Sequence, residues 1–467
     1  MCECQAEFND LHAKLHDAIM KGDQENIKSL LKVHPINDPI TIWKNCALFP
    51  ILPAQVTPAI NSDNHSLSLQ YNLQEANTCQ NSLIFVIHFY HPKGLAILPI
   101  HLAATYRKAK SLQCLLQLKA DIEARDALGR TALHLIIVHW PNIIQDWIVP
   151  KTKFEKAMAG MQSRAEYCLR LLCQHGVQVN VATQSRSQDT AMHLAVRHGA
   201  WPAVAILARY GGNLETANQH GMTPLHMASG LLDRRMVEEL LGRGARLDSK
   251  VAGSGSTPLQ LAVCAASGKG AQQLGAGLDC VRVLLAAGAS VVAQDQHGRA
   301  AVHEACFGGR EELIDLLLEH DADLSLCTEL GESPLSLFLE RKPNLRCSRL
   351  LAKLLSLSCP LRIASKEGGQ LPGGLLGPEF RQYREFLLAL SQEPPALQDL
   401  CRVVVRKVYG HRQRQRIKEI LPTSVWQFVY GYQDYAKRLA EIAVKPIEWP
   451  DREGQGDLDN SLLHMHL

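Results

Sequence analysis

The stretch DQHGRAAVHEACFGGREELIDLLLEHDADL, residues 295–324, contains a tetrad, AAVH at 300–303, that recurs along the chain. Related tetrads are LPIH (98–101), TALH (131–134), TAMH (190–193), TPLH (223–226), TPLQ (257–260) and SPLS (333–336). Their last residues, from His101 to Ser336, are separated by 33, 59, 33, 34, 43 and 33 residues. A period of 33 residues therefore organises this region, and the two longer intervals indicate insertions of 26 and 10 residues.

Each unit predicts a turn followed by two short helices. In the unit that begins near residue 219, Gly221 suits a turn, Thr223 can cap the first helix and Pro224 falls at the first helical position. The second helix, MVEELL, ends near Gly244, a residue that can adopt the left-handed conformation that closes a helix. A chain of such units buries a continuous core only by stacking neighbours.

The repeated residues resemble the ankyrin repeat. The resemblance is carried by DALGRTALHL, NQHGMTPLHMA and the stretch 295–324; it covers about 98–355 and, more faintly, LHDAIMKGDQENIKSLLK at 15–32. It implies an all-α ankyrin-repeat solenoid of helix-turn-helix units with hairpin-like turns, and a binding protein rather than an enzyme. A protein client would lie on the array.

The segment HEAC raises a competing hypothesis, because His303, Glu304 and Cys306 are residue types that bind zinc or act in hydrolysis. The resemblance implies instead that His303, like His101, His134, His193 and His226, bonds to the backbone and ties one turn to the next. Packed helices lie about 8–10 Å apart, whereas zinc needs its nitrogen ligands at about 2.0–2.1 Å, so equivalent histidines of neighbouring units cannot share one ion. We therefore predict no catalytic residue, no metal and no cofactor.

The composition limits compartment and partners. The chain of 467 residues has a formal net charge of +3, and its 14 cysteines are scattered. Free thiols in a reducing compartment, the cytoplasm or the nucleus, are therefore expected, in keeping with an N-terminus that has no apolar core of a signal peptide. The most apolar run, SLIFVIHFY at 82–90, is too short to span a bilayer, so no membrane partner is expected.

The tail has an amphipathic pattern of its own. PALQDLCRVVVRKVYG, residues 395–410, places its apolar residues at helical spacing on one face. It resembles a SOCS box, the module by which many ankyrin proteins recruit elongin B/C and a cullin. The resemblance implies that elongin C would contact Ala396, Leu397, Cys401 and Val405, and that a cullin would contact Leu421 and Pro422.

Thr423 and Ser424 depart from that family's cullin-selecting pattern. The alternative for the amphipathic helix is a cap on the last repeat, which solenoids need, and both alternatives stay open. The basic run RKVYGHRQRQRIK at 406–418 could bind nucleic acid, but the near-neutral whole favours a solvated helix face.

The sequence predicts six segments, which are an N-terminal capping unit (1–37), a polar and disordered insertion (38–97), the array (98–355) with insertions near 139–163 and 267–279, a linker (356–389), the SOCS-box-like module (390–432) and a C-terminal tail (433–467).

Overall fold

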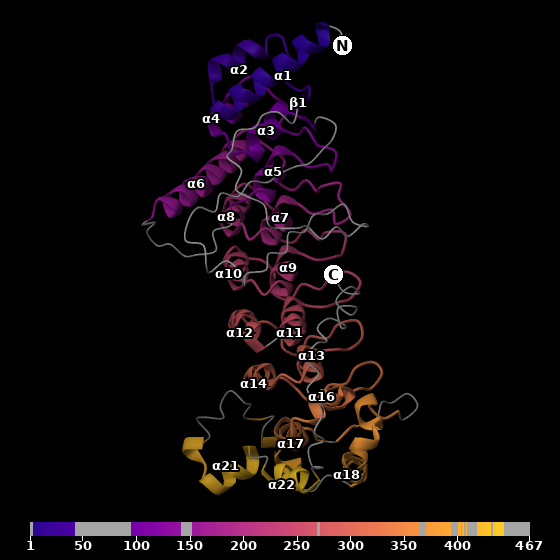
Figure 1. The fold of residues 1–467 in the computed structure, drawn as a ribbon. Coiled ribbons are helices and arrows are strands. Elements are labelled where there is room, and N and C mark those ends of the chain that lie inside the picture. Colours follow the sequence, from indigo (N-terminus) through magenta and orange to yellow (C-terminus); the bar gives the residue numbers. More distant parts are fainter. Residues whose placement is uncertain are drawn as a thin grey trace.

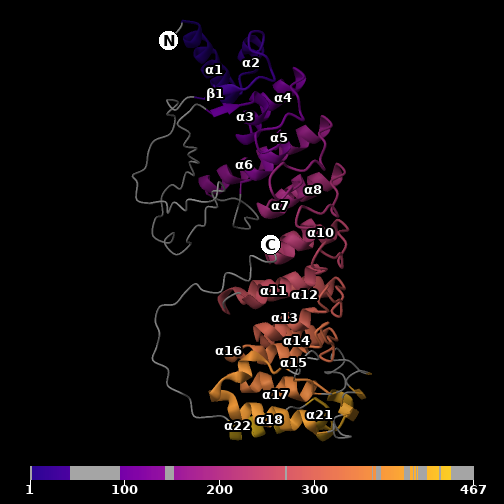
Figure 2. The ribbon, with the colours of Figure 1, turned by 90° about the vertical axis from the view of Figure 1, so that its right-hand side faces the viewer.

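The computed structural model describes residues 3–42, 95–141, 152–268, 271–359, 361–363, 370–393, 400–402, 404–405, 408, 418–430 and 433–442. Helices in this structure stack in pairs along one axis, from the N-terminal unit at one end to α17, α18 and α22 at the other (Figures 1 and 2). The first helices of the pairs form one column: α3 (Pro99–Thr105), α5 (Ala132–Val138), α7 (Ala191–Arg197), α9 (Pro224–Gly230), α11 (Pro258–Gly268), α13 (Ala301–Gly308) and α15 (Pro334–Glu340). The second helices form another: α4 (Ala109–Gln117), α6 (Lys153–Gln174), α8 (Trp201–Arg209), α10 (Arg234–Gly242), α12 (Ala271–Ala286), α14 (Glu311–Glu319) and α17 (Ser348–Leu357). A short helix, α16 (Lys342–Leu345), lies between α15 and α17.

Local signals and tertiary packing agree within each pair. The Thr223 side chain accepts a hydrogen bond from the backbone of His226, and Pro224 stands at the start of α9. In α10, Met236, Val237 and Leu240 are buried, and this face packs on α9, α8 and α12. A helix this short is marginal by itself, so its apolar face stabilises it through the neighbouring units.

Hairpin-like turns join consecutive units and bond to one another. The backbone N–H of Gln219 donates to Ser187 O at 2.9 Å, and the N–H of Glu329 donates to His297 O at 3.0 Å. Gly298 shows why the turn needs glycine: its φ is +73°, and a Cβ there would lie 2.8 Å from the backbone nitrogen of Glu329. The turns project to one side of the stack in Figure 1 and face the viewer in Figure 2.

Both array insertions are largely helical where the structure describes them. The first lengthens α6, which begins with a capping box between Thr152 and Glu155. The second, predicted near 267–279, lengthens α11 and α12. Gly277 allows the two helices to pack, because a Cβ at this position would lie 2.7 Å from the Cβ of Ala266, so the glycine lets α12 approach α11 closely.

The N-terminal unit consists of α1 (Glu3–Lys21) and α2 (Gln24–Leu30), and α2 packs on α4. The predicted polar insertion begins and ends in strands, since β1 (Ile40–Ile42) pairs antiparallel with β2 (Leu95–Ile97) and Ile40 lies opposite Ile97. Ile40 is fully buried. Apolar β-branched residues at both ends of the insertion account for this pair. Residues 43–94, where we predicted disorder, lie outside the described residues.

The segment beyond the array contains regular structure within the predicted linker (356–389) as well as after it. It holds two 3-10 turns (Gly373–Leu376 and Pro378–Phe380), α18 (Arg381–Gln392), α21 (Thr423–Tyr430) and α22 (Gln433–Ile442). Helix α22 packs against α17 and α18, and its Leu439 is fully buried. The last repeat is therefore covered by α22, which we had assigned to the tail. The repeat solenoid itself is confirmed, with the β1–β2 pair as an addition to an otherwise helical fold.

Candidate functional site

The tetrad histidines link each turn to the next one. His134 Nδ1 accepts the backbone N–H of Thr131 at 3.1 Å and lies 2.9 Å from the Thr131 hydroxyl. A ring nitrogen that accepts an N–H carries no proton, so the proton of the neutral ring is on Nε2. Nε2 lies 3.0 Å from the carbonyl oxygen of Val181, to which it donates. His193 repeats this arrangement with Thr190 and Met222 O.

Burial keeps these rings neutral. It lowers the pKa of His134, His226 and His303 to about 4, and it also lowers the pKa of His101 and His193. The neutral rings of His134 and His193, each held between two backbone groups, therefore act as structural elements.

The HEAC residues serve separate structural roles. His303 is fully buried, and its Nδ1 accepts the N–H of Ala300 at 3.0 Å. Glu304 pairs with Arg299 at 3.5 Å, and burial raises the pKa of the Cys306 thiol. In the part of the chain that the structure describes, no three His, Cys, Asp or Glu side chains are grouped as metal ligands.

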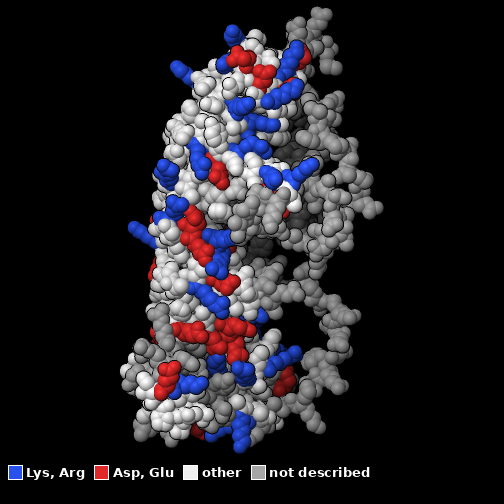
Figure 3. Space-filling view, turned by 90° about the vertical axis from the view of Figure 1, so that its left-hand side faces the viewer, with Lys and Arg blue, Asp and Glu red and all other residues white. Residues whose placement is uncertain are grey.

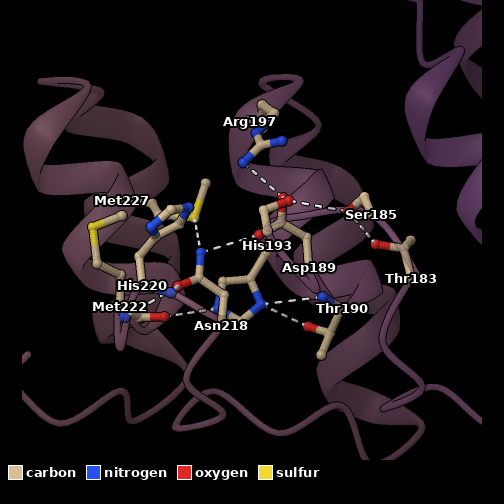
Figure 4. A network of polar contacts seen from close by, with 11 residues as sticks. Thr183, Ser185, Asp189, Thr190, His193, Arg197, Asn218, His220, Met222 and Met227 are labelled. Carbon is tan, nitrogen blue, oxygen red and sulfur yellow. Dashed lines mark hydrogen bonds and ion pairs between the residues drawn. The ribbon is translucent and has the colours of Figure 1, made fainter. Parts of the chain in front are cut away.

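One turn carries a buried carboxylate, which the sequence analysis did not single out (Figure 4). The Asp189 side chain is 1% exposed and pairs with Arg197 at 2.6 Å. Ser187 Oγ donates to the same carboxylate at 2.8 Å, and Asn218 Nδ2 of the following turn donates to it at 3.1 Å. A charge-assisted network of side chains thus joins two consecutive turns, in addition to the backbone bonds between them. In the sequence, the only signal for this network is the position of Asp189 directly before the TAMH tetrad.

The tips of the turns present different side chains from unit to unit. Leu128 and Leu330 are 52% and 51% exposed at their tips, whereas the equivalent tips elsewhere carry His220 and His297. A constant backbone ladder with variable tips and first helices forms an extended surface suited to protein partners.

The predicted elongin-binding residues are described only in part. Ala396 and Leu397 lie outside the described residues. Cys401 is exposed, and Leu400, Val404 and Val408 are 44%, 59% and 70% exposed, at intervals of four residues in helical conformation. Sequence reasoning placed these three on the same apolar face but did not select them as contacts.

Val405 and Leu421 pack within the module. Both are half-buried against Val429, together with Trp426 and Phe428. Their role here is internal packing, in addition to the partner contacts that we predicted for them. Pro422 is exposed, and its carbonyl oxygen accepts the N–H of Trp426 at 3.0 Å, which leads the chain into α21.

Of the basic run at 406–418, the structure describes Val408 and Lys418. The Lys418 ammonium lies 5.1 Å from the centre of the Trp426 ring, a cation–π contact within the module. Among the described helices, none is long and apolar enough to cross a bilayer.

Comparison with known families agrees with the repeat geometry. Residues 157–251 and 232–328 match the family model described as ankyrin repeats (3 copies). Between residues 157 and 328 the units are ankyrin repeats. Modules of this kind bind protein partners, and the ankyrin array of this chain has the continuous surface that such binding uses.

Curated relatives share parts of the ankyrin array. The chain is 27% identical over 187 residues to the E3 ubiquitin-protein ligase KEG of Arabidopsis thaliana, covering 39% of this chain and 11% of that protein. It is 26% identical over 377 residues to human ankyrin repeat and SOCS box protein 16, covering 68% of this chain and 82% of that protein. The chain thus spans only about a tenth of the plant ligase. A solved structure, the ankyrin repeat domain of Bcl-3, is 27% identical and covers 52% of this chain and 93% of its own, with a TM-score of 0.42.

Proposed function

We propose that this protein is an intracellular adaptor, in the cytoplasm or the nucleus, whose ankyrin array binds a client while its tail recruits elongin B/C and a cullin as part of a ubiquitin ligase. The observation that carries the proposal is the apolar face of Leu400, Val404 and Val408 beside Cys401, which is exposed in the described residues. An exposed helix face of this kind fits a helix-in-groove contact. The likeness to ankyrin repeat and SOCS box protein 16 supports it.

The internal packing of the module suits the same role. Val429 is buried against Val405 and Leu421, and Arg402 Nε donates to Phe428 O at 2.8 Å. These contacts hold the helix that contains Cys401 against α21. A partner would thus meet a face that is already formed, which lowers the entropy cost of binding.

A scaffold without a ligase connection is the second candidate. The observation in its favour is the packing of α22 on α17, because capping of the last repeat accounts for this part of the tail. Thr423 and Ser424 at the start of α21 depart from the cullin-selecting pattern of the SOCS box. The cullin contact is therefore the weaker part of the first proposal.

The test is binding of purified elongin B/C to the full-length chain. The wild type should bind at micromolar concentrations, and Leu400→Asp with Val404→Asp should abolish binding, because two charges would enter an apolar contact. Leu397→Ala with Cys401→Phe should do the same. Ile420→Asp, at a residue that is 79% exposed and outside that face, is the matched control and should bind normally.

Unchanged melting temperatures in all three variants would show that the array is intact. A wild-type chain that fails to bind elongin B/C would leave the scaffold as the function.

A further inference from the structure

A patch of cations that pair with no carboxylate among the described residues lies on the outer face of the array near its N-terminal end. We call Arg107, Lys108, Lys110 and Arg164 the basic patch; the first three lie at the start of α4 and the fourth on α6. Lys110 and Arg164 are exposed, and Arg107 and Lys108 are half-buried. Figure 3 shows Lys and Arg side chains gathered on this upper part of the face, whereas Asp and Glu gather lower on the same face.

Arg107 occupies a backbone position that favours glycine. In several units the residue two positions before the second helix is left-handed: Gly22, Gly199 and Gly309 have φ of +75°, +61° and +64°. Arg107 adopts φ of +55° at this position. A side chain there costs about 1 kcal/mol relative to glycine. Leu232, the other non-glycine at this position, is 9% exposed and gains burial in return.

Lys108 lies at a position where two other units have a side-chain helix cap, whereas Ala200 and Arg310 in two further units also provide none. In the units of α2 and α10 the equivalent residues, Asp23 and Asp233, accept hydrogen bonds from the backbone of Asn26 and Met236. Lys108 cannot accept, and α4 has no side-chain cap. Positive charge at the start of a helix is also unfavourable. The pair Arg107–Lys108 therefore weakens the local structure where Gly22–Asp23 supports it.

No carboxylate compensates these charges within the part of the chain that the structure describes. Two arginines elsewhere on the outer helices are paired: Arg170 with Glu166 at 3.2 Å and Arg243 with Glu239 at 3.0 Å. Among the described residues, Arg107 donates to the carbonyl oxygen of His139. Burial and the nearby Arg164 lower the pKa of both Arg107 and Lys108, so the cations are close enough to repel one another.

We propose that the basic patch binds an acidic segment of a protein partner, whose carboxylates pair with Arg107, Lys108, Lys110 and Arg164. Cations held together at the expense of local stability are explained by a ligand that neutralises them. A protein segment is the class that fits, because ankyrin repeats bind proteins and Tyr106, beside the patch, is 48% exposed and offers apolar contact. The patch is separate from the tail, so this binding and elongin binding can fail independently.

The test uses the full-length protein and a fluorescein-labelled oligoglutamate peptide, followed by fluorescence anisotropy. The wild type should bind at low ionic strength, and added salt should weaken binding. Arg164→Gln, at an exposed helical position, should weaken it about two- to fivefold. The matched control is Lys119→Gly, which removes one exposed cation at a left-handed residue (φ +62°) outside the patch and should leave binding unchanged.

Arg107→Gly supplies a second readout. If the arginine is kept for its charge, the glycine variant should bind the peptide at least twofold more weakly while its melting temperature stays equal or rises. A fall in both peptide affinity and melting temperature would show that Arg107 stabilises the fold through its bond to His139.

The proposal would be overturned by a wild type that does not bind the peptide, or by equal binding in the wild type and Arg164→Gln. Anionic vesicles and single-stranded DNA are the competing probes. Arg164-dependent binding of either one, with no binding of oligoglutamate, would replace the protein partner by that ligand.

Discussion

Gln260 Nε2 donates to the carbonyl oxygen of Arg299 at 2.6 Å, in the place where neighbouring units use a histidine ring. Its Oε1 accepts the N–H of Thr257 at 2.7 Å. An amide therefore supplies the acceptor and the donor that Nδ1 and Nε2–H supply in His193. The tie between turns depends on this pair of groups rather than on an imidazole.

His193→Gln should accordingly be tolerated, with a loss below about 1 kcal/mol of unfolding free energy. His193→Leu should cost about 2 kcal/mol or more, because the N–H of Thr190 and the carbonyl of Met222 would lose a buried partner. Urea denaturation of both variants measures the difference. Equal losses would mean that ring shape, not hydrogen bonding, is what matters.

Stability should fall on acidification between about pH 6.5 and pH 4. The folded pKa of His134, His226 and His303 is lowered to about 4 from 6.5, so in this range the unfolded chain binds protons that the native rings do not. The stability that each buried neutral ring contributes is fully present above pH 6.5. It is lost as pH falls toward 4, by up to about 3 kcal/mol for each ring. Urea midpoints at several pH values measure the slope. His226→Gln should reduce this dependence of stability on pH. An unchanged slope would show that other titrating groups cause the dependence.

Two glycines of α12 should respond in opposite ways to alanine. Gly277→Ala should destabilise by about 1–3 kcal/mol, because the new methyl group would lie 2.7 Å from the Cβ of Ala266. Gly275→Ala meets nothing within 4 Å and should stabilise by about 0.5–1 kcal/mol through helix propensity. Thermal melts compare the pair. Stabilisation by both substitutions would show that α11 and α12 lie farther apart than in this structure.

Removal of the buried carboxylate should be costly. Asp189→Ala would leave Ser187 and Asn218 without their acceptor, and we expect a loss of about 2–3 kcal/mol. Arg234→Ala is the comparison, because its pair with Glu238 is solvent-exposed and its loss should change stability far less. Chemical denaturation measures both, and similar losses would contradict the importance of the network.

Repetition made the fold readable from the sequence. The tetrads fixed the period, and Thr223, Pro224 and Gly221 each mark a local conformation that the structure contains. Both insertions were predicted, but the helical form of the second was not, because the role of Gly277 depends on Ala266 on another helix. The buried Asp189 was missed for a similar reason, since the cation and the amide around it come from separate elements. The apolar face of the tail helix was visible in the sequence. The sequence could not show that Val405 packs against Val429 while Val404 is exposed, because this depends on contacts with α21.

The cover of α17 by α22 has a consequence for the newly made chain. Leu351 and Leu354 of α17 are fully buried, and α22, with its buried Leu439, lies across this helix from far along the sequence. At ribosomal rates of about 5–20 residues per second, several seconds separate the synthesis of α17 from that of its cover. During that time the growing polypeptide carries an apolar end that chaperones can bind, and a premature stop codon before residue 433 would make the condition permanent.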